Sequence, residues 1–149
     1  MSQSNTYSFL NVQATIVGPG GSFNIGQGAA VSEEGITVDM VDDKDAMTIG
    51  ADGIGMHSLR ASKAGTVTVR LLKTSPQNSK LMAMYDLQQT SSTLWGQNVI
   101  TVVDTGGNDN TTARGVAFTK KPSIVYSKDG QMLEWKFNCV AVDSVLGTY

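Results

Sequence analysis

Short runs that alternate apolar and polar residues recur along the chain, with glycine-containing segments between them. The clearest run lies near the C-terminal end. Its apolar positions share one face: Leu133, Trp135, Phe137, Cys139 and Ala141. Its other positions share the opposite face: Met132, Glu134, Lys136 and Asn138. A period of two is the period of a β-strand, because successive side chains point to opposite faces. We therefore expect a mainly β fold.

Other segments show the same period. Residues 66–73 place Val67, Val69 and Leu71 on one face and Arg70 on the other. Residues 36–41 likewise have their apolar positions on one face and Asp39 on the opposite face. A first alternating run covers residues 7–17, and shorter strands are expected at 112–121 and 122–127. The pair Asp129-Gly130 favours a type I′ hairpin turn into the last strand.

Residues 97–104 are apolar on both faces. A strand of this kind is covered on both sides by its own chain or is buried at a subunit contact. The sequence alone leaves both possibilities open.

One helix is predicted, at about 75–89. Ser75 is a suitable N-cap residue. Pro76 suits the first helical position, because a backbone N–H there would have no hydrogen-bond partner within the helix. Leu81, Met84 and Tyr85 then form a stripe at helical spacing, which predicts that the helix packs against the sheet.

Composition limits the possible functions. With 149 residues and 40% hydrophobic content, the chain suits one domain, 1–149. Its net charge of −2 gives no basic field for sequence-specific nucleic-acid binding. It has one cysteine and no apolar run near the roughly 20 residues that span a bilayer. We expect a protein that folds in a reducing cytoplasm and does not itself bind a membrane.

An acidic segment, with Asp42, Asp43 and Asp45, lies between two strand-like runs. An EF-hand loop that began at Asp43 would place Met47 at a ligand position and would lack its glycine, so calcium spacing fails. A weakly bound cation is the alternative to a solvated turn. We expect a β-hairpin with residues 42–45, including Lys44, at its tip.

Enzymatic signatures are missing. Gly53 and Gly55 stand at G-x-G spacing, but Ser58 occupies the third glycine position. His57 and Cys139 would form a dyad only if the fold brought them together, and Cys139 lies on an apolar face, where a free cysteine acts as a small hydrophobe. We assign no catalytic residue, cofactor or metal.

The order of features resembles the tail tube proteins of contractile-tailed bacteriophages and, more distantly, the hemolysin-coregulated protein of type VI secretion. Four segments carry the resemblance and cover most of the chain: 6–21, 36–53, 65–81 and 129–147. It implies a β-sandwich or barrel-like tail tube fold flanked by one helix. In this family, hexameric rings close an inner β-barrel and stack into a tube that conducts DNA into the host.

The resemblance also implies partners and a location. The partners are other copies of the chain, the tail sheath, baseplate and tail terminator proteins, and, in the lumen, the tape measure protein and DNA bound without sequence specificity. The protein would belong to the virion and be assembled in the host cytoplasm. Alternatives are another virion structural protein, such as a capsid decoration or tail-completion protein, a small β-rich binding module, and a small hydrolase.

Two sets of residues receive roles from the resemblance. Contacts between rings are expected from the acidic hairpin: Asp42, Asp43, Lys44 and Asp45. The channel wall is expected from the outward faces of three strands: Asp39, Arg70, Glu134, Lys136 and Asn138. We expect Arg70 and Lys136 to pair with carboxylates, which leaves them less available to phosphates.

Overall fold

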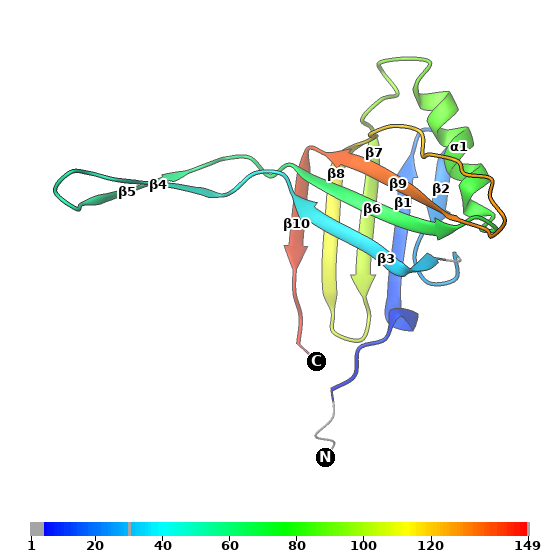
Figure 1. Ribbon diagram of the computed structural model, residues 1–149, viewed down its shortest axis with the longest axis horizontal. Helices are drawn as coiled ribbons and strands as arrows, with labels where there is room; N and C mark the ends of the chain where they lie inside the picture. Colours follow the sequence, from blue (N-terminus) through cyan, green and yellow to red (C-terminus); the bar gives the residue numbers. More distant parts are fainter. Residues whose placement is uncertain (1–4, 30, 149) are drawn as a thin grey trace.

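Two antiparallel layers of strands face each other across the core in the computed structural model, which describes residues 5–29 and 31–148 (Figure 1). One layer contains β1 (Val12–Gly18), β2 (Gly21–Asn24), β7 (Asn98–Asp104), β8 (Asp109–Phe118) and β10 (Ala141–Val145). The other contains β3 (Val31–Met40), β6 (Gly65–Leu72) and β9 (Met132–Cys139). The last residues of β8, Ala117 and Phe118, pair with β9 and join the layers. The fold is thus mainly β, in a sandwich-like arrangement.

The strand path is open. It runs β2-β1-β7-β8-β9-β6-β3, with β10 paired to β8, so the described strands of one chain do not close a barrel. An unpaired edge of a sheet exposes a row of backbone N–H and C=O groups that can pair with another chain.

Aromatic side chains fill the space between the layers. The Phe118 ring centroid lies 5.5 Å from that of Tyr85, 5.9 Å from Trp135 and 4.9 Å from Phe137. The expected inward residues of β6 and β9 are buried: Val67, Val69, Leu71, Leu133, Trp135 and Phe137. Each such side chain stabilises the fold by about 1.5–3 kcal/mol when it leaves water, so the alternating pattern identifies the core.

The single α-helix is confirmed, as α1 (Gln77–Gln88), at one end of the sandwich beside β2. Leu81 and Met84 are buried as expected. Pro76 occupies the N-cap position and not the first helical position that the sequence predicts. The buried Ser75 hydroxyl still accepts a hydrogen bond from the Gln77 amide, at 3.3 Å. The same hydroxyl donates to the Ala29 carbonyl at 2.6 Å, which ties the start of the helix to the loop after β2.

The first strand starts later in the chain than the sequence predicts. The strand begins at Val12, because Phe9–Asn11 forms a short 3-10 turn, η1. Ser8 caps this turn: its hydroxyl accepts from the Leu10 amide at 3.1 Å. The alternation is correct from Val12 onward, where Val12, Ala14 and Ile16 are buried.

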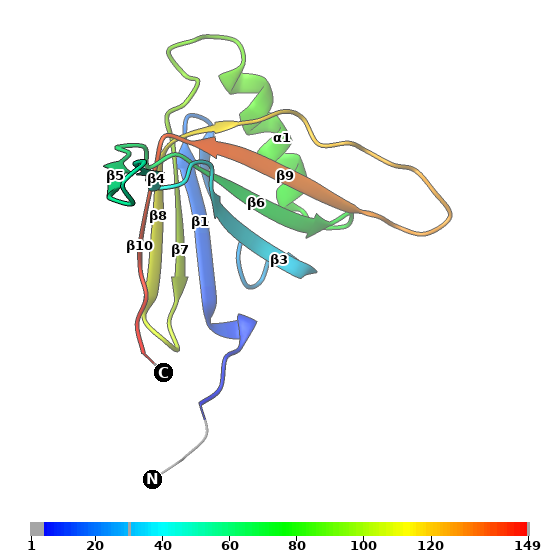
Figure 2. The ribbon, with the colours of Figure 1, turned by 60° about the vertical axis from the view of Figure 1, so that its left-hand side comes forward.

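The strand predicted at 122–127 is wrong, and so is the hairpin turn at 129–130. Residues 119–131 form a loop without strand pairing that swings out from the sheet (Figure 2). β9 pairs with β6 along its whole length but with β8 only at Phe137 and Asn138, and residues 119–131 form no strand along the rest of that second edge. We call residues 119–131 the basic loop, because Lys120, Lys121 and Lys128 outnumber Asp129.

The last strand does not continue through Ala141. It ends at Cys139, Val140 is 72% exposed, and β10 then pairs with β8 in the other layer. This bend puts Val142, and not Ala141, in the core. Gly115 in β8 permits the crossing, since its φ is 62° and an added Cβ would lie 2.9 Å from the Val140 side chain.

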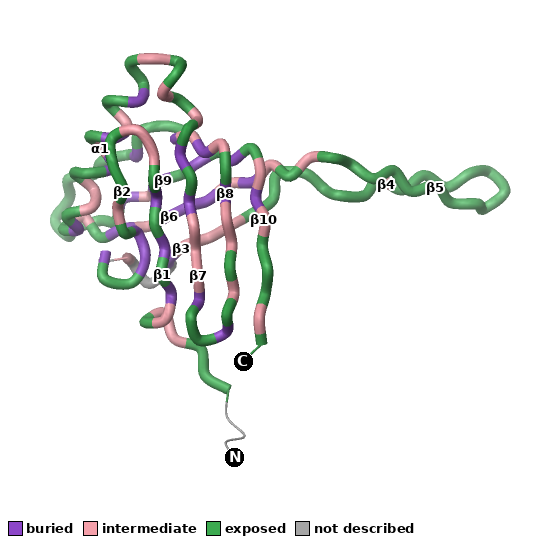
Figure 3. The backbone as a smooth tube through the Cα atoms, turned by 180° about the vertical axis from the view of Figure 1, so that it is seen from behind, coloured by how far each residue is buried: buried purple, intermediate pink, exposed green. Residues whose placement is uncertain are grey.

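A long arm projects from the body (Figures 1 and 3). It consists of β4 (Asp45–Ile49) and β5 (Gly55–Leu59), which pair with each other in a separate two-stranded sheet. The predicted hairpin is therefore wrong in its strand pairing: β3 pairs with β6, residues 42–45 lie at the base of the arm, and the tip of the arm is at residues 50–54. Asp52 and Gly53 make the turn, with Gly53 at φ 86° and the Asp52 carboxylate accepting from the Ile54 amide at 3.2 Å.

No helix among the described residues has the length and apolar character needed to cross a membrane.

Candidate functional site: two sheet faces and a projecting arm

The outward face of β3, β6 and β9 collects the residues predicted for a channel wall. Strand register places Arg70 opposite Glu134, Thr68 opposite Lys136, and Thr66 between Asp39 and Asn138. All five predicted residues thus lie on one face, because their positions alternate with the buried ones. We call this surface the polar face.

One carboxylate holds both cations of the polar face. Glu134 Oε2 lies 3.4 Å from Arg70 Nε, and Glu134 Oε1 lies 3.3 Å from Lys136 Nζ. Arg70 also donates from Nη1 to the Thr37 hydroxyl at 3.2 Å, and its side chain is only 19% exposed. The expected pairing of Arg70 and Lys136 with a carboxylate is confirmed, with the same partner for both. Paired cations attract phosphates less strongly than free ones.

The outward face of the other layer is more apolar. Valine side chains stand on it in β1, β7 and β10: Val17, Val99, Val103 and Val145. Val99 and Val103 belong to the segment that is apolar on both faces, and Val99 remains 37% exposed in the single chain. We call this surface the valine face. A second copy or another protein is needed to cover it fully.

The valine face has a charge cluster of its own. Asp143 in β10 pairs with Arg114 in β8, and its Oδ1 lies 3.3 Å from Lys63 Nζ. The Arg114 guanidinium, and then the Lys63 ammonium, hold the pKa of Asp143 below its ordinary value. Each outward face therefore has one carboxylate between two cations, and the polar face differs by the additional carboxylate of Asp39 and by its lower apolar content.

Three of the four residues predicted at the hairpin tip instead fasten the base of the arm. Lys44 Nζ donates to the carbonyls of Arg60 and Ser62, both at 3.0 Å. The Ser62 hydroxyl donates to Asp42 Oδ2 at 2.8 Å, and Asp45 Oδ2 lies 2.9 Å from His57 Nδ1.

Asp43 differs from its neighbours. It is exposed and makes no side-chain hydrogen bond or ion pair within the described part of the chain. Its charge is therefore available to another molecule.

Beyond its base, the arm exposes apolar side chains. Five of them are more than half exposed: Met47, Ile49, Ile54, Met56 and Leu59. An isolated two-stranded hairpin is marginally stable in water, and exposed apolar patches commonly mark contact surfaces. The sequence predicts no strand at residues 54–59, so this surface was missed. The pairing of Met47 with His57 and of Thr48 with Met56 reveals it.

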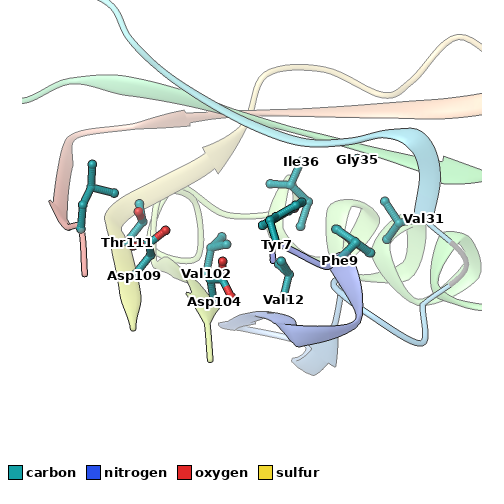
Figure 4. Close-up of a pocket in the computed structure, with 11 residues that line it drawn as sticks. Tyr7, Phe9, Val12, Val31, Gly35, Ile36, Val102, Asp104, Asp109 and Thr111 are labelled. Carbon is teal, nitrogen blue, oxygen red and sulfur yellow. The ribbon is translucent and has the colours of Figure 1, made fainter. Parts of the chain in front are cut away.

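A cavity of about 580 Å³ opens at one end of the sandwich, between β3 and the β7–β8 hairpin (Figure 4). Its wall is mostly apolar: Tyr7, Phe9, Val12, Val31, Ile36 and Val102. Two carboxylates at the cavity accept backbone hydrogen bonds. Asp104 accepts from the Gly106 amide at 3.0 Å and stabilises the turn after β7, and Asp109 accepts from the Gly147 amide at 2.8 Å and holds the segment after β10. The lining residues come from several distant segments, so no sequence motif could have identified the cavity.

The groups considered for catalysis do not come together. His57 lies on the exposed arm, whereas Cys139 is 4% exposed in the core, and burial raises the pKa of its thiol to about 11. A thiol with so high a pKa stays protonated near neutral pH and is a poor nucleophile. Among the residues whose side chains the structure describes, no group of three or more His, Cys, Asp and Glu is placed to hold a metal ion.

Solved structures with the same fold belong to contractile injection systems. A sheath/tube terminator of the extracellular contractile injection system PVC aligns with TM-score 0.63 at 10% identity, over 97% of this chain and 99% of that one. The PVC sheath-tube complex contains a chain that aligns with TM-score 0.59 at 12% identity, over 97% and 94%. The cap of the anti-feeding prophage AFP, which terminates its tube, gives 0.58 at 12% identity, over 99% and 95%. At these identities the likeness concerns the fold.

A search of curated proteins gives no significant match. The family is established by the sequence itself, since the family model described as bacteriophage PhiTE tail tube protein matches residues 4–147, nearly the whole chain. This protein belongs to the PhiTE-type family of bacteriophage tail tube proteins.

Proposed function

We propose that the chain is the repeating subunit of a phage tail tube, in which hexameric rings stack around a channel that delivers DNA into the host. The observation that carries the proposal is the polar face, which lies on a sheet whose outer strand, β3, pairs on one side only. Sheets of this kind can join edge to edge between copies until a barrel closes and no free edge remains.

The charges of the polar face suit a channel for DNA. A wall with strong positive potential would bind phosphates and retard the moving strand. Here Glu134 pairs with both Arg70 and Lys136, and Asp39 supplies the second negative charge, so the formal charges of these four residues sum to zero. We therefore assign Asp39, Arg70, Glu134, Lys136 and Asn138 to the channel wall. The valine face then points away from the channel, toward neighbouring proteins.

The proposed partners follow from this arrangement. Neighbouring copies would cover the free edges and the arm. The related solved structures include a sheath-tube complex, a terminator, a cap and a baseplate, so sheath, baseplate and terminator proteins are the expected external partners. The channel would hold the tape measure protein and then DNA. The protein would reside in the virion after assembly in the host cytoplasm, with a structural and not an enzymatic role.

Electron microscopy of the purified protein tests the proposal. Tubes, or stacks of rings with a central channel lined by the polar face, are the expected result. A terminator is the competing role because terminators share this fold. A terminator would form single rings that do not stack at any concentration. A monomer under all conditions, together with its absence from the tails of virions, would contradict both roles.

A further inference from the structure

The basic loop, residues 119–131, is an uncovered surface with both charge and apolar character. Lys120, Lys121 and Lys128 are exposed on it. Between these lysines, Val125 is 51% exposed and Tyr126 is 84% exposed. Lys73 adds a further positive charge, with its Nζ 5.0 Å from the centroid of the Tyr126 ring. The loop is therefore positively charged and partly apolar.

The loop also stands away from its own sheet. A space of about 390 Å³ lies beside it, lined in part by Lys120, Val125 and Met132. Pro122 is the buried residue of the segment, and its neighbours on both sides are exposed. The apolar side chains of the basic loop thus lack a complete contact within the chain.

The arm carries the complementary chemistry. Its base has the free carboxylate of Asp43 beside Asp42, and its strands expose Met47, Ile49 and Met56. The arm and the basic loop lie at opposite ends of the molecule (Figures 1 and 2). Complementary surfaces at opposite ends cannot meet within one chain, but they meet between copies related head to tail, and such a contact repeats without limit.

We propose that the basic loop is the surface that receives the arm of the next copy along the tube, with Asp43 at the base of the arm against its lysines. This inference rests on the proposed function and names the contact that stacks one ring on another. The cavity of Figure 4 is the competing receptor for the arm. Its carboxylates, Asp104 and Asp109, carry the same sign of charge as Asp43, so charge favours the basic loop.

A charge swap tests the pairing. Asp43→Lys alters the arm without removing a hydrogen bond, and Lys121→Asp alters the loop. Each variant alone should raise the protein concentration needed for tube assembly by about tenfold or more, because like charges then meet in every copy. The chain with both substitutions should regain assembly. Raising the salt concentration should weaken wild-type stacking and reduce the effect of each single variant.

Asp86→Lys is the matched control. It makes the same change of charge on an exposed part of α1 and should leave assembly unchanged. All four variants should keep the melting temperature of the wild type, which shows that the fold is intact. A second control, Tyr7→Asp, places a charge at the competing cavity. Loss of stacking in this variant, together with normal stacking by Lys121→Asp, would show that the arm binds the cavity and not the basic loop.

The outcomes separate the two proposals, provided that self-association is measured by sedimentation as well as by microscopy. Tubes that form equally well with Asp43→Lys or Lys121→Asp, or that the double swap fails to restore, would overturn the pairing and leave the tube function intact. Open head-to-tail oligomers that obey the swap but never form rings would overturn the tube function and support the pairing. No self-association by the wild-type chain would overturn both.

Discussion

Arg70 and Glu134 face each other across the β6–β9 strand pair, with 3.4 Å between Arg70 Nε and Glu134 Oε2. The other oxygen of the same carboxylate lies 3.3 Å from Lys136 Nζ. Removal of the negative charge of Glu134 would deprive both Arg70 and Lys136 of this carboxylate, on the surface that we assign to the channel. The charge balance of the polar face therefore depends on Glu134 more than on any other residue of the set.

Glu134→Gln should slow DNA passage through assembled tails, because Lys136 loses its carboxylate partner and the channel wall gains net positive charge. The effect should diminish as salt rises. Asp143→Asn is the matched control, since Asp143 also lies between two cations but on the valine face. The measurement is the rate of DNA ejection from phage carrying each variant, at several salt concentrations. Slower ejection in the Asp143 variant and normal ejection in the Glu134 variant would place the valine face in the channel.

Shortening the arm should prevent stacking without unfolding the body. Strands β4 and β5 pair only with each other, so replacing residues 45–59 by a short Gly-Ser turn removes no strand pairing from the sandwich. We expect a melting temperature close to that of the wild type, and tubes should be lost. Calorimetry and electron microscopy provide the two measurements.

A milder variant separates the arm's length from its apolar surface. Met47→Ser combined with Met56→Ser keeps the hairpin and removes exposed apolar area from it. Tubes of normal length from this variant would show that the apolar side chains of the arm make no necessary contact.

The end of α1 is joined to the sheet by a buried pair of amides. Gln88 Nε2 donates to Asn98 Oδ1 at 2.7 Å and to the Pro19 carbonyl at 2.8 Å, and Asn98 Nδ2 donates to Gln88 Oε1 at 2.8 Å. Gln88→Leu leaves the buried Asn98 amide unpaired, which should cost about 1–3 kcal/mol of unfolding free energy. In a chain of this size, each kcal/mol lowers Tm by about 2–4 °C.

Gln89→Leu is the control for this prediction, because Gln89 is the next residue and is exposed. Thermal unfolding of both variants measures the difference. Equal Tm values for the two variants would show that the buried amides do not stabilise the fold.

Cys139 should resist alkylation in the folded protein. Its side chain is buried, and the raised pKa of about 11 leaves only about one thiol in a thousand ionised at pH 8. We expect labelling by a thiol reagent to begin only in the urea range where the chain unfolds. Val140→Cys, at the exposed neighbouring position, should label at once in the same protein. Fast labelling of Cys139 in native buffer would mean that the end of β9 opens locally.

The sequence by itself determined the strand faces and the helix. Alternation in residues 66–72 and 132–139 identified the buried residues and, by the same period, placed Arg70, Glu134, Lys136 and Asn138 together on the opposite face. A cap, a proline and a helical stripe identified α1 in the same way. These features follow from neighbouring residues, because the direction of a side chain along a strand or helix is fixed locally.

Tertiary structure decided which strands pair. The acidic segment flanked by two alternating runs predicted a hairpin, yet β3 pairs with β6, while β4 pairs with β5 and forms the arm. Pairing depends on the edges that distant segments leave free, and this competition has no signature in a local stretch of sequence. The contact of Glu134 with both Arg70 and Lys136 is decided in the same way, since the register between β6 and β9 brings Arg70 opposite the carboxylate.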